Sequence, residues 1–157
     1  NAIKINGIEN LKVREIKGLL TTKILQAQEK NIRISIEVPE PIEKIDMPIV
    51  NLSRAIGIIL DNAIEASEKN EDDPLIRIAF IKNNDDSVMF IVMNKCDPDM
   101  PKIHTLFKEN YSTKGKNRGL GLSTLKELTD TTSNVLLDTT IDNNYFIQKV
   151  EILNSNS

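Results

Sequence analysis

The sequence predicts an α/β (α+β) two-layer sandwich, in which helices cover one face of a mixed, mostly antiparallel sheet. Three observations predict this class. The 157 residues are enough for one domain with a substantial core. Apolar residues recur at helical spacing in two long stretches, and pairs of short strands are joined by polar turns. A few helices among several hairpins pack most simply as one helical layer on one sheet.

The first expected element is an amphipathic helix over about residues 8–30. Its apolar residues recur three or four positions apart: Val13, Ile16, Leu20, Ile24 and Ala27. The pattern is compatible with packing on its own domain or on a partner helix, and both remain open at this point. A half-buried strand follows over residues 32–38, because isoleucine and valine alternate there with polar residues until Pro39 ends it.

A second helix over residues 52–67 is apolar along one side, and the rest of the chain is organised around it. Its apolar arc contains Leu52, Ile56, Ile59, Ala63 and Ala66. Pro48 suits the first turn of such a helix, since its missing N–H has no intrahelical partner there. Asp61 and Glu65 lie on the opposite, solvated side. Asn62 falls at the boundary between the two sides, next to the core.

Two strands, residues 75–82 and 87–94, are expected next, joined by a polar turn at residues 83–86. The second strand is apolar almost throughout, which predicts a central strand covered on both faces. From residue 95 to residue 118 no periodicity is sustained. A loop of this length in a small domain is usually functional, for instance a lid.

The chain after this loop predicts one more helix and one more hairpin. Gly119-Leu120-Gly121-Leu122 leads directly into a helix expected from Ser123 to about Asp130. Strands near residues 134–139 and 145–153 are joined by an Asp-Asn-Asn turn at residues 142–144.

Composition excludes several classes of function. The net charge of −3 does not suggest a nucleic-acid surface. The single Cys96 cannot form an internal disulfide, and the single His104 excludes a multi-histidine metal site. No apolar run reaches the roughly 20 residues that span a bilayer. Because the chain begins at Asn1 rather than Met, we expect it to be a piece of a larger protein.

Gly119 and Gly121 are the first candidate ligand-binding residues. Glycines before a helix let the backbone approach an anion, toward which the N-terminal amides point. This is a plausible phosphate cradle, but it matches neither common nucleotide motif. No Lys-Ser/Thr pair follows the glycines at the Walker position, and Thr124 stands where the dinucleotide fingerprint requires a glycine.

Residues 107–114 (FKENYSTK), followed by Gly115 and by Arg118 to Leu122, resemble the ATP lid of bacterial sensor histidine kinases. Residues 61–66 (DNAIEA) resemble the N box of that family, and Val92-Met93-Asn94 stands where its first glycine box begins. The motifs occur in the family's order over about residues 32–153. The Asn94-Lys95-Cys96 variant looks most like the quorum-sensing receptor kinases of Gram-positive bacteria.

The resemblance implies a Bergerat-type ATP-binding fold with a long lid over about residues 95–118. Asn62 would offer its side-chain oxygen to Mg²⁺, which prefers hard oxygen ligands. Asn94 would accept from the adenine amino group, while Phe107 and Tyr111 would anchor the lid. The remaining cofactor-binding residues, which would hold the phosphates of ATP, are Lys114, Arg118, Gly119, Leu120 and Gly121.

Two departures from the family pattern matter. Asn94, Cys96 and Pro98 occupy the Asp-x-Gly-x-Gly positions of the first glycine box. A neutral acceptor forms a weaker hydrogen bond than a carboxylate, so we expect weak adenine binding. Ile58 stands where ATP-hydrolysing relatives carry a catalytic glutamate, so efficient ATP hydrolysis is not expected.

The resemblance implies that the chain donates the γ-phosphoryl of Mg-ATP to a histidine on an upstream dimerisation domain. Residues 1–30 would be the end of the dimerisation hairpin with its linker, and residues 31–157 the catalytic and ATP-binding domain. His104 does not match the phosphoacceptor, so no catalytic residue is assigned. The implied partners are the kinase's own dimerisation domain, a second copy and a response regulator.

The implied location is the cytoplasmic side of a bacterial membrane receptor whose absent membrane domain senses an autoinducing peptide. Two alternatives remain open. One is a serine/threonine kinase of the same fold, like the anti-sigma-factor kinases. The other is a degenerate interaction module without nucleotide, which the altered first glycine box favours.

Overall fold

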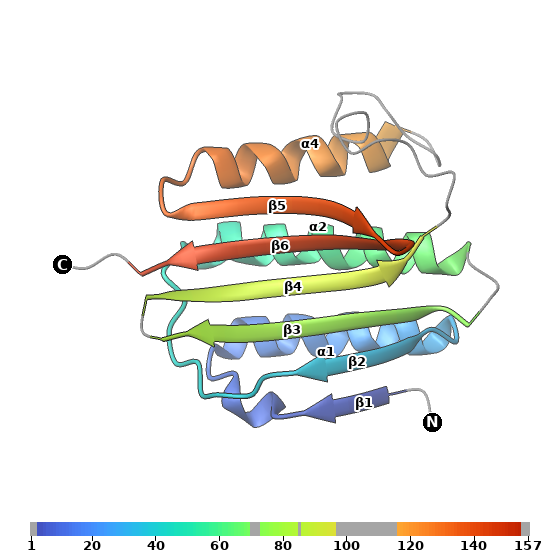
Figure 1. The fold of residues 1–157 in the computed structure, drawn as a ribbon, viewed down its shortest axis with the longest axis horizontal. Helices are drawn as coiled ribbons and strands as arrows, with labels where there is room; N and C mark the ends of the chain where they lie inside the picture. Colours follow the sequence, from blue (N-terminus) through green and yellow to red (C-terminus); the bar gives the residue numbers. More distant parts are fainter. Residues whose placement is uncertain (1–2, 70–72, 85, 97–115, 155–157) are drawn as a thin grey trace.

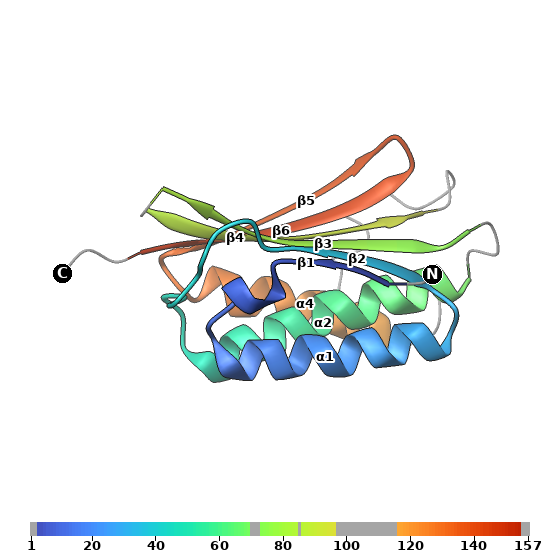
Figure 2. The same cartoon turned by 90° about the horizontal axis from the view of Figure 1, so that it is seen from below.

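The computed structural model describes residues 3–69, 73–84, 86–96 and 116–154, and it has two layers. A six-stranded sheet carries a layer of helices on one face (Figures 1 and 2). The elements are β1 (Ile3–Asn6), the 3₁₀ helix η1 (Ile8–Asn10), α1 (Arg14–Glu29), β2 (Arg33–Glu37), α2 (Ile49–Glu68), β3 (Leu75–Asn83), β4 (Ser87–Lys95), α4 (Lys116–Asp130), β5 (Val135–Asp142) and β6 (Tyr145–Leu153). The predicted α/β (α+β) two-layer class is confirmed.

The sheet is mixed, with the strand order β1-β2-β3-β4-β6-β5. β1 pairs with β2 and β2 with β3 in parallel, whereas the remaining three pairings are antiparallel. The hairpin between β5 and β6 turns at Asn143 and Asn144, whose φ angles are +51° and +64°. Asparagine tolerates this left-handed conformation, which explains why the Asp-Asn-Asn sequence predicted the turn correctly.

The core lies between the sheet and the helices. α2 occupies the middle of the helical layer, with α1 on one side and α4 on the other (Figure 2). Phe80 of β3 and Phe90 of β4 are buried opposite each other, with ring centroids 4.8 Å apart. Leu52, Ile56 and Ile59 of α2 are buried as its apolar arc predicts.

The N-terminal residues belong to the same two layers. β1, which the sequence analysis did not predict, forms one edge of the sheet. α1 buries Ile16, Leu20, Ile24 and Ala27 in the common core, so it packs on its own domain. The domain boundary expected at residue 30 therefore lies between α1 and the strands against which α1 packs.

The expectation that β4 is covered on both faces is wrong for the described residues. Helices cover only the face of Val88, Phe90 and Val92, which are buried (Figure 2). Met89 and Ile91 point to the opposite face and are only half-buried. In an unbroken apolar run the residues of both faces are apolar. The sequence therefore cannot distinguish a strand covered on both faces from a strand covered on one.

The expected start of the last helix is also wrong. α4 begins at Lys116 rather than Ser123, so Gly119 and Gly121 lie in its first two turns. Glycine disfavours helix interiors by about 1 kcal/mol relative to alanine, so this pattern predicts a loop. The expected loop over residues 95–118 is correspondingly shorter, and its residues 97–115 lie outside the described residues.

Candidate functional site

Asn62 is buried in α2, and its amide nitrogen is unpaired. Its relative exposure is 6%, and Nδ2 has no hydrogen-bond partner among the described residues. Leaving a buried polar group unpaired costs about 1–3 kcal/mol, so such groups usually have a ligand or water partner. Because the oxygen and nitrogen of an amide exchange places by a half-turn, the same side chain can present either atom. Asn62 is therefore suited to bind a polar ligand.

Asn94 is the second buried amide, near the end of β4. It pairs with Ile76 of β3 on one side and with Phe146 of β6 on the other. The side chain is 1% exposed, and Nδ2 donates to the backbone oxygen of Lys95 at 3.0 Å. The nitrogen is thereby engaged, which leaves Oδ1 as the atom that can accept a hydrogen bond from a ligand.

The start of α4 supplies backbone donors. The first amides of a helix have no partner within it, and in α4 these include the amides of residues 116–118. Gly119 and Gly121 lie just beyond these amides, so their expected part in anion binding stays a prediction. The side chains of Arg118 and Leu120, together with Lys114, lie outside the described residues.

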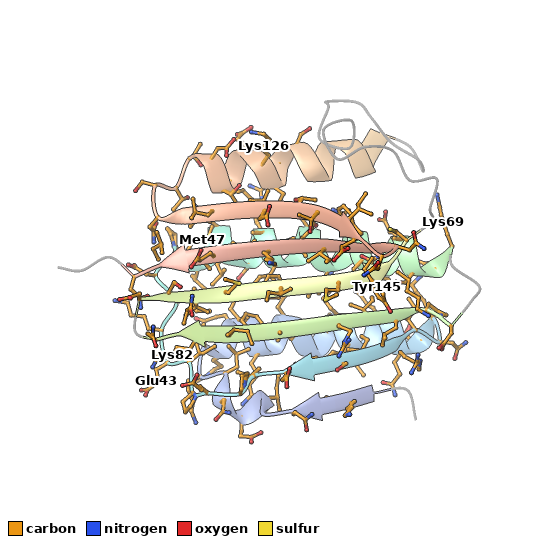
Figure 3. The ribbon with its side chains drawn as sticks, viewed as in Figure 1. Glu43, Met47, Lys69, Lys82, Lys126 and Tyr145 are labelled. Carbon is orange, nitrogen blue, oxygen red and sulfur yellow. The ribbon has the colours of Figure 1, made fainter. Side chains whose placement is uncertain are left out.

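These elements meet at one end of the molecule. β4 ends, α2 approaches its C-terminus and α4 begins at the same end of the molecule, on the right in Figure 1. Lys69, which follows α2, and Tyr145, which starts β6, mark this end, whereas Glu43, Met47 and Lys82 lie at the opposite end (Figure 3). The fold thus brings Asn62, Asn94 and the first amides of α4 to one region.

Gln148 of β6 is a buried polar residue that the sequence analysis missed. It is 2% exposed, and Nε2 donates to the hydroxyl oxygen of Thr139 at 3.3 Å. In the register with β4 it lies opposite Val92, one core-facing pair along from Asn94. A polar residue at a core-facing position of the alternating sequence Phe146 to Ile152 was the signal that could have found it.

Other residues singled out in the sequence have less to contribute. Ile58 is partly buried against the core. The backbone N–H of Cys96 donates to the backbone oxygen of Asn144 at 2.8 Å. His104, Phe107 and Tyr111 lie outside the described residues.

Two other kinds of feature are absent from the described ranges. No cluster of three or more His, Cys, Asp or Glu side chains there could hold a metal ion. None of the helices in these ranges combines the length and apolarity needed to cross a bilayer.

Comparison with known proteins identifies the family. A sequence model described as the GHKL domain matches residues 47–153, which contain both asparagines and α4. The chain belongs to the GHKL domain family. A relative, sensor protein CitS of Bacillus subtilis (strain 168), is 29% identical over 123 residues. The match covers 75% of this chain but 22% of CitS, so the chain spans about a fifth of that relative.

Solved structures show that this GHKL domain has the fold of histidine kinase catalytic domains. The catalytic domain of histidine kinase ThkA superposes with a TM-score of 0.74 at 21% identity, covering 90% of this chain and 94% of that one. ThkA has also been solved in complex with the response regulator TrrA, with a TM-score of 0.72, 18% identity and coverage of 92% and 41%. Full-length ShkA in complex with AMPPNP gives a TM-score of 0.69 at 20% identity, with coverage of 90% and 31%.

Proposed function

We propose that this chain is the catalytic and ATP-binding domain of a sensor histidine kinase. It binds Mg-ATP where α2, β4 and α4 meet, and it donates the γ-phosphoryl group to a histidine on a dimerisation domain elsewhere in the full-length protein. The observation that carries this proposal is the buried, unpaired amide of Asn62, in a GHKL domain, at the end of the sheet that also holds Asn94. The AMPPNP in the ShkA structure supports a nucleotide as the ligand.

The residues present fit the nucleotide and a magnesium ion. Asn62 would turn its oxygen toward the metal, and Asn94 would accept from the adenine amino group through Oδ1. The first amides of α4, with Arg118, Gly119, Leu120, Gly121 and Lys114, would hold the phosphates. Bound Mg²⁺ would neutralise the phosphate charge. The chain's own contribution is positioning, which is the main demand of phosphoryl transfer.

The finer identity is part of the same proposal. The full-length protein would be a membrane receptor kinase of the quorum-sensing type, similar to AgrC, with this domain in the cytoplasm and an autoinducing peptide as its signal. It would act as a homodimer and pass the phosphoryl group to a response regulator. The ThkA–TrrA complex supports a response regulator as the partner.

We also propose that the catalytic domain begins at β1 rather than at residue 31. β1 and α1 share the sheet and the core with the remaining elements. The match to the ThkA catalytic domain covers 90% of this chain. The unmatched tenth is smaller than residues 1–30, so at least part of this segment lies within the match.

The test is a calorimetric titration of Mg-ATP into the chain and into two variants. Asn62→Ala removes the amide that carries the proposal. Asn51→Ala is the matched control, because it removes an asparagine from the other end of the same helix. We expect the control to bind like the unaltered chain, and the affinity of Asn62→Ala to fall by about tenfold or more.

Equal binding by the unaltered chain and Asn62→Ala would place the nucleotide elsewhere. No binding by the unaltered chain at millimolar Mg-ATP would contradict the proposed function. That result would favour the interaction module instead.

A further inference from the structure

An ion pair joins α1 to α2 at the residue next to Asn62. Lys23 Nζ lies 2.6 Å from Asp61 Oδ1. The lysine side chain is only 15% exposed, whereas that of the aspartate is 51% exposed. A lysine side chain that is largely covered places its charge close to the protein surface, where a carboxylate partner compensates for lost hydration. Asp61 is thus held toward α1.

The helix geometry separates Asp61 from Asn62. Successive residues of a helix are about 100° apart, so two adjacent side chains cannot point in one direction. α2 lies between α1 and α4 (Figure 2). Because Asp61 turns to α1, Asn62 is directed away from α1, toward the side of the sheet and α4.

The charge of Asp61 would matter to an anionic ligand at Asn62. A carboxylate one residue away repels the phosphates of a nucleotide at short range. Without a cation beside it, the Asp61 charge would therefore oppose the phosphates of a nucleotide at Asn62.

We propose that Lys23 is a positioning residue of the nucleotide site: it neutralises Asp61 and holds that carboxylate away from the Mg-ATP bound at Asn62. This inference rests on the proposed function. It assigns to α1 a role in the site although α1 contributes no ligand. The first part of the chain then affects nucleotide affinity through a single ion pair.

The same two helices carry a natural control. Lys30, which directly follows α1, and Glu68 form a second pair at 3.1 Å, each seven residues further along the chain than its counterpart. Lys30 is more open to solvent than Lys23, at 44% exposure, and Glu68 is 35% exposed. Glu68 is six residues beyond Asn62, which corresponds to about 9 Å along the helix axis. Replacing Lys30 removes one positive charge from this side of the molecule, as replacing Lys23 does, but the charge removed is not beside Asn62.

The experiment is a set of Mg-ATP titrations at low and at high salt. Lys23→Met should weaken binding about fivefold at low salt, because Asp61 is then unopposed. The loss should shrink at high salt, since exposed charges are screened. Asp61→Asn should bind at least as well as the unaltered chain. The double variant, Lys23→Met with Asp61→Asn, should recover that affinity, and Lys30→Met should bind unchanged.

If the ion pair of Lys23 with Asp61 only stabilised the fold, a different pattern of affinities would be expected. Asp61→Asn would then weaken binding as much as Lys23→Met, the double variant would not recover, and salt would have no effect. Any of these results would overturn the inference, as would an equal loss in Lys30→Met.

Two further comparisons separate a folding defect and a failure of the proposed function from a failure of this inference. If Lys23→Met fails to fold, Lys23→Gln serves as the shorter polar replacement with the same expected loss and rescue. Binding by the unaltered chain with no change in the Lys23 variants refutes only this role of Lys23. Failure of the unaltered chain to bind refutes the proposed function as well.

Discussion

At the scale of single residues, the two buried asparagines differ in what they offer. Asn62 has an unpaired nitrogen, while the nitrogen of Asn94 is held by the backbone oxygen of Lys95. Asn62 is therefore able to reorient for a ligand, whereas Asn94 presents its oxygen in a fixed direction. A fixed acceptor suits a rigid base, and a reorienting amide suits a metal with its phosphates.

Asn94→Asp is expected to tighten adenine binding while lowering stability. A carboxylate accepts a hydrogen bond about twice as strongly as a neutral amide, which corresponds to roughly a fivefold gain in affinity. The same change removes the bond to Lys95, so the free energy of unfolding should fall by about 1–2 kcal/mol. Titration with ADP in the absence of Mg²⁺ removes the contribution of the metal, and urea unfolding measures the stability.

Asn94→Leu is the matched control, since it keeps the size of the side chain but has no acceptor. It should bind ADP much more weakly than the unaltered chain. An Asp variant that also binds more weakly would show that Asn94 does not receive the adenine amino group.

At the scale of elements, the N-terminal segment is held along the strand and loop that follow α1. Val38 N–H donates to the backbone oxygen of Asn6 at 2.9 Å, and Asn10 Nδ2 donates to that of Val38 at 2.8 Å. Lys12 and Ile42 continue the contact with a backbone bond of 2.8 Å. Between β1 and η1, Gly7 has a φ of +78° and lies against the backbone of Val38.

Gly7→Ala should destabilise the domain by about 2 kcal/mol or more. A Cβ at this position would lie 2.2 Å from the oxygen of Val38, and the positive φ adds strain for any residue but glycine. Gly18→Ala is the control, because no atom lies within 4 Å of a Cβ added there. In the interior of α1 this alanine should stabilise by about 0.5–1 kcal/mol.

Chemical unfolding of the two glycine variants, followed by circular dichroism, measures both effects. A Gly7→Ala protein as stable as the unaltered chain would mean that the N-terminal segment does not contact Val38 as described. It would also remove the main support for a domain that begins at β1.

At the scale of the whole molecule, the sequence predicted the two layers correctly but not the edge strand β1 or the parallel pairing beside it. The long apolar arcs of α1 and α2 and the asparagine turns are strong local signals, and they led to the correct class. β1 has four residues at a sheet edge, which is too short for its period to be recognised. The parallel pairing of β1, β2 and β3 depends on contacts between distant segments, which no local pattern encodes.

The candidate site was predictable to a similar degree. Asn62 and Asn94 were found from motif order, and the structure buries both at one end of the sheet. The register that brings Gln148 near Asn94 and the ion pair of Lys23 with Asp61 are tertiary contacts. Both lie between segments far apart in the chain, so spacing alone could not reveal them.

The central claim, that this chain holds Mg-ATP where α2, β4 and α4 meet, is tested most directly by nuclear magnetic resonance. At 17.7 kDa the chain is small enough for its amide signals to be followed one by one during a titration with Mg-ATP. We predict that the side-chain amides of Asn62 and Asn94 and the backbone amide of Gly119 shift together, while those of Asn51 and β1 do not. Shifts confined to other residues, or none at millimolar nucleotide, would contradict the claim.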